Sequence, residues 1–282
     1  MKKLNYLFLA LVMGFATVAC SNDKDNDPKP TAPEQSQPQD TTPTTQPTTQ
    51  PTAPAAVAKV SSVKVNYEEG FYNLVTLTRN DEGQVVSIKE SAYTPEGDEQ
   101  GESSELELVY EANSVVISGE EAVVVYTLDE SGKVIKSATS YLEDGEEYLL
   151  YEIAFSYTEA GMLNEVVLTS EEEGDYPIFS AEYGEDNNMT AVIIDEEEVD
   201  VAVGTVANPV GLDCNLILFM YGFFDEIDYA ILSGMIPSTP NVISSCYGGY
   251  MTTQTTQDAN GNVASLALEE DGEIMCSYEF AY

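Results

Sequence analysis

Carboxylates are the most abundant groups in this sequence that could do chemistry. The 282-residue chain has 50 Asp and Glu against 10 Lys and Arg, a formal net charge of −40. Two dense acid runs occupy residues 171–175 and 195–200. Such oxygens could hold Ca²⁺, and two carboxyls at a set separation could hydrolyse a glycoside. Neither run has the spacing of a calcium-binding loop. We therefore predict a solvated acidic surface with no metal site and no catalytic residue, and keep Ca²⁺ as the alternative.

The composition excludes several classes of function. The chain has no His, so Ser-His-Asp triads, Cys-His pairs and His-ligated metals are ruled out. A sequence pI of about 4.1 argues against nucleic acid as a partner, because phosphate backbones are bound through Lys and Arg. We predict no enzymatic activity and no cofactor.

Three cysteines, Cys214, Cys246 and Cys276, lie in the second half of the chain. Their separations match no zinc pattern, and there is no His to activate a thiolate. We expect buried, inert thiols. A single disulfide is the alternative, because an exported chain can be oxidised.

The first 19 residues have the layout of a secretory signal peptide. Two Lys precede an almost wholly apolar stretch, 4–19, which is short for a membrane span. Small residues then lead into a cysteine at Thr17-Val18-Ala19-Cys20. This resembles the lipobox of bacterial lipoproteins, with Thr17 where Leu is usual, and implies lipid attachment at Cys20. Ordinary cleavage after Ala19 is the alternative.

Residues 20–57 predict a surface-exposed stalk. The acidic cluster at 21–27 resembles the surface-export signal of Bacteroidetes lipoproteins, which implies a lipid-anchored protein on the exterior of the outer membrane. Pro, Thr and Gln then dominate, a composition that favours an extended spacer. Asp40-Thr41-Thr42 resembles a Bacteroidetes O-glycosylation motif, which makes Thr41 a candidate attachment site.

Residues 58–282 predict one β-rich domain. Val, Ile, Tyr, Leu and Thr alternate with polar residues, and an acid-plus-Gly or Asn turn recurs between the apolar stretches. The unit is clear at 77–85, 128–134, 157–163 and 257–263, with a looser copy at 183–189. Short turns of this kind join antiparallel strands. We expect an antiparallel up-and-down meander that curls into a partly open barrel.

One segment, about 215–235, has helical spacing instead. Its apolar residues cover nearly the whole helix surface, which is typical of a buried helix. Asp213 is placed to cap the N-terminus, and Pro237 follows the end. We predict a single apolar α-helix surrounded by the curved sheet. It either fills the core or lines a cavity for an apolar ligand.

The motifs of this domain also resemble a known group of proteins. The resemblance rests on the leader, the hairpin turns, the segment 208–216 before the helix with Pro237 and Pro240 after it, and the closing segments 258–263 and 278–282. Together they resemble an uncharacterised Bacteroidetes lipoprotein domain of unknown function with a porin-like β-fold. That resemblance implies a fold and no chemistry.

The functional expectation is a non-catalytic binding or structural domain on the cell surface. A glycan is one possible partner, through tyrosines in place of the missing Trp. A carrier of a lipid or other apolar ligand is the alternative. A transmembrane barrel is a third interpretation, disfavoured by the charge on many strands. The sequence leaves the oligomeric state open.

Overall fold

The computed structural model describes residues 59–67, 70–119, 122–143, 146–170, 174–194, 197–222 and 224–282. The chain divides into two units, 1–56 and 57–282. Everything below concerns the second unit. The predicted signal peptide, the stalk, Cys20 and Thr41 lie outside the described residues.

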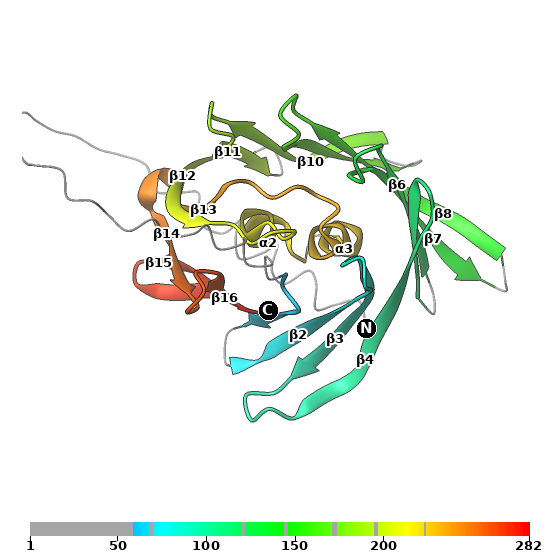
Figure 1. Ribbon diagram of the computed structural model, residues 1–282, viewed down its shortest axis with the longest axis horizontal. Coiled ribbons are helices and arrows are strands. Elements are labelled where there is room, and N and C mark those ends of the chain that lie inside the picture. Colours follow the sequence, from blue (N-terminus) through cyan, green and yellow to red (C-terminus); the bar gives the residue numbers. More distant parts are fainter. Residues whose placement is uncertain are drawn as a thin grey trace, which may run out of the picture. The chain divides into compact units, whose positions relative to one another are not determined.

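The described residues form sixteen strands in a single antiparallel sheet (Figure 1). The strands are β1 (Ser62–Asn66), β2 (Tyr72–Arg79), β3 (Val85–Tyr93), β4 (Glu99–Tyr110), β5 (Ser114–Ser118), β6 (Ala122–Leu128), β7 (Val134–Glu143), β8 (Glu146–Tyr157), β9 (Leu163–Ser170), β10 (Gly174–Tyr183), β11 (Met189–Ile194), β12 (Glu197–Ala207), β13 (Asn241–Cys246), β14 (Met251–Gln257), β15 (Val263–Glu270) and β16 (Glu273–Ala281). Each strand pairs with its neighbours in sequence, so the meander predicted from the hairpin turns is confirmed.

The barrel is closed, and the expectation of a partly open one was wrong. β1 pairs with β16 along its whole length, with Val63 opposite Phe280 and Val65 opposite Tyr278. These four side chains are buried, while Lys64 between them forms an ion pair with Glu279 at 3.2 Å. Matching period-2 patterns on the two terminal strands make this seam possible, and closure leaves no unpaired sheet edge.

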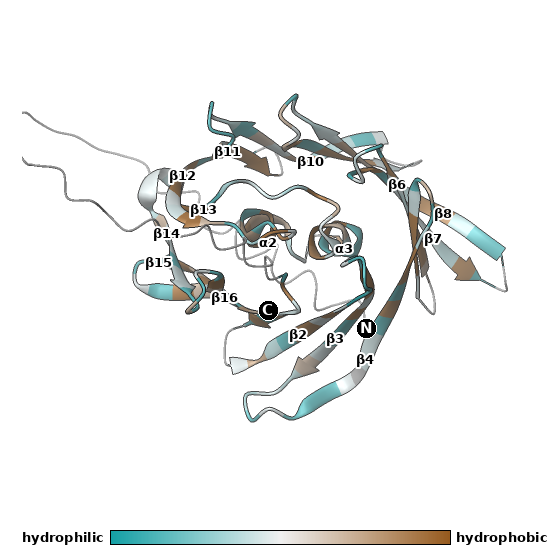
Figure 2. Cartoon of the chain, viewed as in Figure 1, coloured by the Kyte–Doolittle hydropathy of each residue, from teal (hydrophilic) through white to brown (hydrophobic). Residues whose placement is uncertain are grey.

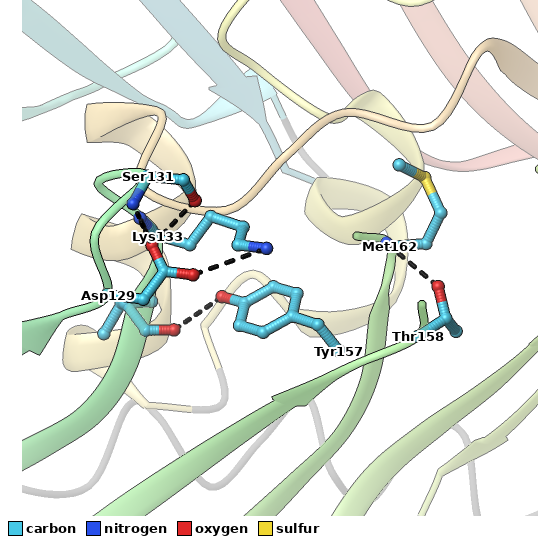
Figure 3. Close-up of polar contacts among 7 residues, drawn as sticks. Asp129, Ser131, Lys133, Tyr157, Thr158 and Met162 are labelled. Atoms are coloured by element: carbon cyan, nitrogen blue, oxygen red, sulfur yellow. Dashed lines mark hydrogen bonds and ion pairs between the residues drawn. The ribbon is translucent and has the colours of Figure 1, made fainter. Parts of the chain in front are cut away.

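Each predicted turn joins two strands that are consecutive in the chain. In the turn between β6 and β7, Asp129 Oδ1 accepts hydrogen bonds from the backbone N–H groups of Ser131 and Lys133 at 2.8 and 2.9 Å (Figure 3). Gly132 there has φ +85°. Asp258 Oδ1 likewise accepts from the N–H groups of Asn260 and Asn262. The side-chain cap and the positive φ are the reasons that these residues make tight turns.

Two helices replace the single helix expected at 215–235. α2 spans Cys214–Met220, and α3 spans Asp225–Ser233. The chain breaks between them at Gly222, whose φ is +88° and whose N–H donates to Asp228. α3 ends at Gly234, also in the left-handed region. Apolar periodicity alone did not reveal this break, because the apolar residues continue across it.

A buried polar network holds the start of α2. Asp213 caps the helix as predicted, accepting from the N–H groups of Asn215 and Leu216 at 2.8 and 3.3 Å. The other oxygen accepts from Thr239 N at 2.6 Å and Thr239 Oγ1 at 2.9 Å. The Asn215 side chain donates to the carbonyl oxygen of Asn241 and accepts from Ile243 N–H, which ties the helix to β13. The motif around residue 213 is thus structural.

Candidate functional site

Several strands of the wall expose polar side chains and bury apolar ones. On β14, Thr252, Gln254 and Thr256 are exposed. Figure 2 shows hydrophilic stretches at the projecting ends of β4 and β8. Further exposed polar or charged residues follow the same alternation on other strands: Thr76, Lys89, Glu105, Glu107, Lys136, Ser156, Glu182 and Glu279. A barrel that faces lipid alternates in the opposite sense, with apolar residues outward. Several strands of the described wall thus expose polar residues, whereas Val109, Leu149 and Ile274 are exposed apolar residues on β4, β8 and β16.

The two helices bury apolar side chains and contact well-separated strands. Leu216, Ile217, Ile227 and Ile231 are at most 1% exposed. The hydroxyl of Tyr126 on β6 donates to the Glu226 carbonyl oxygen at 2.6 Å, and that of Tyr278 on β16 donates to the Ile217 carbonyl oxygen at 3.5 Å. In the view of Figure 1, both helices lie within the outline of the ring of strands. In the part of the chain that the structure describes, no helix is long and apolar enough to cross a membrane.

The strongest concentration of unusual chemistry is around α3. Glu90 on β3 and Asp225, Glu226 and Asp228 on α3 form what we call the α3 acidic cluster. Glu226 Oε1 accepts from Thr139 Oγ1 at 2.8 Å and from the Tyr151 hydroxyl at 2.9 Å. Glu226 is only 4% exposed, and its other oxygen, Oε2, has no hydrogen-bond partner. A buried carboxylate oxygen without a partner is costly, so its presence needs an explanation.

The other three members of the α3 acidic cluster have raised pKa values, Asp225 because of burial alone. Burial raises the pKa of Asp228 well above its ordinary value, against the lowering effect of the Gly222 N–H bond. The charges of Asp225, Glu90 and Glu226 raise it further. Burial also raises the pKa of Glu90, which accepts from the Asn73 side chain at 2.7 Å. The neighbouring carboxylates of Asp225, Glu90 and Glu226 thus disfavour ionisation of Asp228.

Several tyrosines lie near these carboxyl groups. Tyr229 on α3 has a raised pKa because of burial and then the charges of Asp225, Glu90, Asp228 and Glu226. Tyr67 and Tyr221 are each partly buried and are close enough to Glu90 and Asp228 for those charges to raise their pKa values, after the effect of burial. Tyr151 packs edge-on against Phe224, with ring centroids 5.9 Å apart.

The positive side chains of the described residues lie elsewhere. Lys64, Lys133 and Lys136 form ion pairs with Glu279, Asp129 and Glu152. Lys59 and Arg79 donate to backbone carbonyl oxygens near the turn after β2. Lys89 precedes Glu90 but is on the exposed face of β3. No described Lys or Arg thus makes an ion pair or hydrogen bond with the α3 acidic cluster.

The candidate residues chosen from the sequence fall outside this cluster. Of the two acid runs, the described residues include Asp175, which accepts from Thr169 Oγ1 at 2.7 Å, and the exposed Glu197, Glu198 and Asp200. Among the described residues no group of three potential ligands is arranged to hold a metal ion. Sequence reasoning missed the α3 acidic cluster. The available signal was the acid-rich start of α3, Asp225, Glu226 and Asp228, inside an otherwise apolar segment.

The three described cysteines are free thiols in the structure. Cys214 and Cys246 are buried, and Cys276 is half-buried. Burial raises the pKa of each, for Cys246 to about 11. Protonated thiols of this kind are poor nucleophiles and poor metal ligands.

The exposed tyrosines, through which a glycan could bind, lie in separate parts of the described surface, and Tyr148 stacks on Tyr141 with ring centroids 5.0 Å apart. Tyr148, Tyr176 and Tyr250 are the tyrosines with the greatest exposure, and they lie on β8, on β10 and before β14.

Two open hollows on the surface contain no residue of either helix. One is lined by residues including Thr158 and Tyr183, and the other by residues including Asp200 and Gly249.

Comparisons with known proteins show the fold. A porin-like protein from Bacteroides uniformis superposes with a TM-score of 0.59 at 13% sequence identity, covering 80% of this chain and 98% of that one. A porin-like protein from Bacteroides vulgatus gives a TM-score of 0.53 at 11% identity, covering 79% and 98%. No family model and no curated protein matches the sequence. At the level of the fold, the chain is similar to porin-like proteins of Bacteroides, as the sequence resemblance implied.

Proposed function

We propose that this protein is a lipid-anchored outer-membrane protein whose barrel is a non-catalytic binding module held in water, and not a channel. The observation that supports this is that strands such as β14 expose polar residues (Thr252, Gln254 and Thr256), while the two helices bury apolar ones. In this proposal α2 and α3 plug the barrel. The porin-like relatives are consistent with an outer-membrane setting, and the wall favours a barrel displayed beside the membrane over one embedded in it.

The anchor in this proposal is Cys20, with residues 20–57 as the spacer that keeps the barrel away from the membrane. Acyl chains on one cysteine give stable attachment, since each buried CH₂ contributes about 0.8 kcal/mol. The test is fractionation of cells that express the Cys20→Ala chain, with Cys276→Ala as the control. We expect only the Cys20→Ala protein to leave the membrane fraction. A Cys20→Ala protein that remained in the membrane after carbonate washing would contradict the anchor and favour an embedded barrel.

The closed, plugged barrel makes a second test possible. Full-length protein reconstituted in planar bilayers is expected to produce no ion conductance, because the helices bury fully packed apolar residues. Steady single-channel currents would contradict the proposal. No cofactor is required for a role of this kind. Native mass spectrometry of protein purified from its own host tests the alternative, a carrier of an apolar ligand. A carrier should retain a bound lipid mass. We expect none, because Ile217 and Ile227 are fully buried in the protein's own core.

A further inference from the structure

We propose that the outer edge of β8, the side of residues 146–150 that faces away from β7, docks an extended polypeptide segment with basic and apolar side chains. The proposal rests on the proposed binding function and names the class of partner. Three features of the β7–β8 hairpin support it: an open strand edge, exposed apolar side chains beside that edge, and glutamates at the tip.

The hairpin extends beyond the strands on either side of it. β7 and β8 pair with each other as far as Glu143 and Glu146. Among the described residues, the pairing of β6 with β7 ends at Tyr141, and that of β9 with β8 ends at Glu152. Figure 1 shows this end of the hairpin projecting outward. Residues 146–150 therefore have β7 on one side and no described strand on the other.

An open edge of this kind specifies the shape of its ligand. A two-stranded ribbon is only marginally stable in water, and a third strand stabilises it. The unpaired N–H and C=O groups along the edge are a template for another extended chain, which binds by adding a strand to the sheet.

Apolar side chains are exposed beside this edge. Leu149 and Leu150 are 56% and 47% exposed, and Leu142 and Tyr148 are each 40% exposed. Tyr148 stacks on Tyr141 across the hairpin with the rings 19° from parallel, which stiffens the projecting end. A stiff edge loses little conformational freedom on binding, and an added strand would cover the leucines.

The tip of the hairpin specifies the charge of the partner. Glu143, Glu146 and Glu147 are all exposed there. No ion pair of the described residues includes any of them, and the Lys of β7, Lys136, pairs with Glu152 at 2.5 Å. Lys or Arg on an added strand would pair with these carboxylates across the strands.

The same glutamates disfavour two other occupants of the edge. A membrane could cover Leu149 and Leu150 only if the charged tip entered it as well, which is costly. A second copy would bring the same glutamates and another chain of net charge −40 to the edge. An extended, basic segment of another protein satisfies the open main chain, the leucines and the glutamates together.

The experiment uses the full-length chain and a fluorescein-labelled probe, an eight-residue peptide of alternating Lys and Val. Fluorescence anisotropy measures binding at about 150 mM NaCl, where charges are screened within about 8 Å. The control peptide has the same composition and charge with D-amino acids at alternate positions, so it cannot pair as a regular strand. It separates strand addition from general attraction to an acidic protein.

Two pairs of variants locate the binding. Leu149→Ser with Leu150→Ser alters the edge, and Val109→Ser with Ile135→Ser is its control, which removes exposed apolar side chains from β4 and from the opposite end of β7.

Glu146→Gln with Glu147→Gln removes charge from the tip, and Glu105→Gln with Glu107→Gln removes the same charge from exposed positions on β4. All eight positions are exposed, and circular dichroism checks that each variant folds.

We expect saturable binding near one probe peptide per chain. Each variant at the edge or tip should lose about tenfold in affinity, each control variant should stay within about twofold, and the control peptide should bind at least about tenfold more weakly. Equal losses in test and control variants, or equal binding of the two peptides, would mean diffuse attraction and would overturn the proposal. No binding of the probe to the wild-type chain would overturn it too.

Two further measurements test the other occupants in the Cys20→Ala chain. Flotation with vesicles of phosphatidylethanolamine and phosphatidylglycerol, if Leu149→Ser with Leu150→Ser abolished it, would assign the edge to a membrane. A dimer in sedimentation equilibrium that the same variant dissociated would assign it to a second copy. Either result would overturn the proposal. The Cys20 fractionation and the conductance measurement test the proposed function separately, since neither depends on this edge.

Discussion

The hydroxyl of Tyr157 donates a hydrogen bond to the carbonyl oxygen of Val134 at 2.6 Å (Figure 3). Tyr157 ends β8, and Val134 begins β7. The Val134 N–H donates in turn to the Met235 carbonyl oxygen, just after α3. One tyrosine thus ties two strands of the wall to the segment that leaves the helices. The same contact recurs twice. The Tyr183 hydroxyl donates to the carbonyl oxygen of Leu163, and the Tyr282 hydroxyl donates to that of Val263.

Replacing Tyr157 by Phe removes only this hydroxyl. We expect the free energy of unfolding to fall by about 1 kcal/mol, because the Val134 carbonyl oxygen loses a partly buried donor. Urea denaturation followed by circular dichroism measures the change. Tyr250→Phe is the control, since Tyr250 is 55% exposed and should change stability little. Equal effects of the two substitutions would show that the Tyr157 bond contributes nothing specific.

Gly234 is required for two separate reasons. It has φ +74°, and a Cβ added there would lie 2.8 Å from the Gly211 carbonyl oxygen. We expect Gly234→Ala to cost about 2–4 kcal/mol, of which about 1–2 is the left-handed backbone and the rest is the clash.

Gly132→Ala isolates the backbone part of this cost. Gly132 has φ +85° with nothing within 4 Å of the added carbon. It should therefore destabilise by only about 1–2 kcal/mol in the same urea titration. If Gly132→Ala were as damaging as Gly234→Ala, the close approach to Gly211 would have no energetic role.

The sequence predicted local structure well, because local structure depends on neighbouring residues. Asp129 and Asp258 cap turns that Gly completes. Asp213 caps α2 by accepting from the N–H groups two and three residues further along the chain. Closure of the barrel was not predictable in this way. It depends on Val63 and Phe280 meeting from opposite ends of the domain, and nothing near either residue indicates the partner.

The α3 acidic cluster was missed for the same physical reason. Glu90 reads as an ordinary polar residue of a strand, and only the fold brings it near Asp228. The three acids of α3 do share one short segment. The sequence does not show that Glu226 and Asp228 are buried. An apolar segment that contains acids is equally compatible with a helix whose acids face water.

The thiols provide a test of packing. Because Cys214 and Cys246 are buried with raised pKa values, we expect both to resist a thiol reagent such as DTNB at pH 8. Cys276 is half-buried and should react slowly. In the Cys20→Ala chain, all three should react at once in 6 M guanidinium chloride. Prompt reaction of Cys214 in the native protein would contradict the packing around α2.

Asp228 should make the protein less stable as pH rises. Its pKa is raised in the folded state, so the folded chain binds the proton more tightly than the unfolded chain. Stability is then greatest below the ordinary pKa of about 4 and falls as pH increases toward the folded-state pKa. The raised pKa of Glu90 acts in the same direction. Burial would raise the pKa of Asp129, but hydrogen bonds from Ser131 and Lys133 lower it to about 2. Asp129 therefore stays ionised over the pH range in which Asp228 and Glu90 titrate.

Asp228→Asn keeps an oxygen to accept the Gly222 N–H and removes the charge. We expect the variant to be more stable than the wild type by about 1–3 kcal/mol at pH 8, with a flatter dependence on pH between 5 and 8.5. Glu107→Gln, which removes one charge from the exposed face of β4, is the matched control and should leave the slope nearly unchanged. Urea titrations across this pH range measure all three proteins. Wild-type stability that rose with pH would contradict the predicted direction of the pH dependence. Parallel curves for wild type and Asp228→Asn would show that this carboxyl group ionises as freely in the folded chain as in the unfolded one.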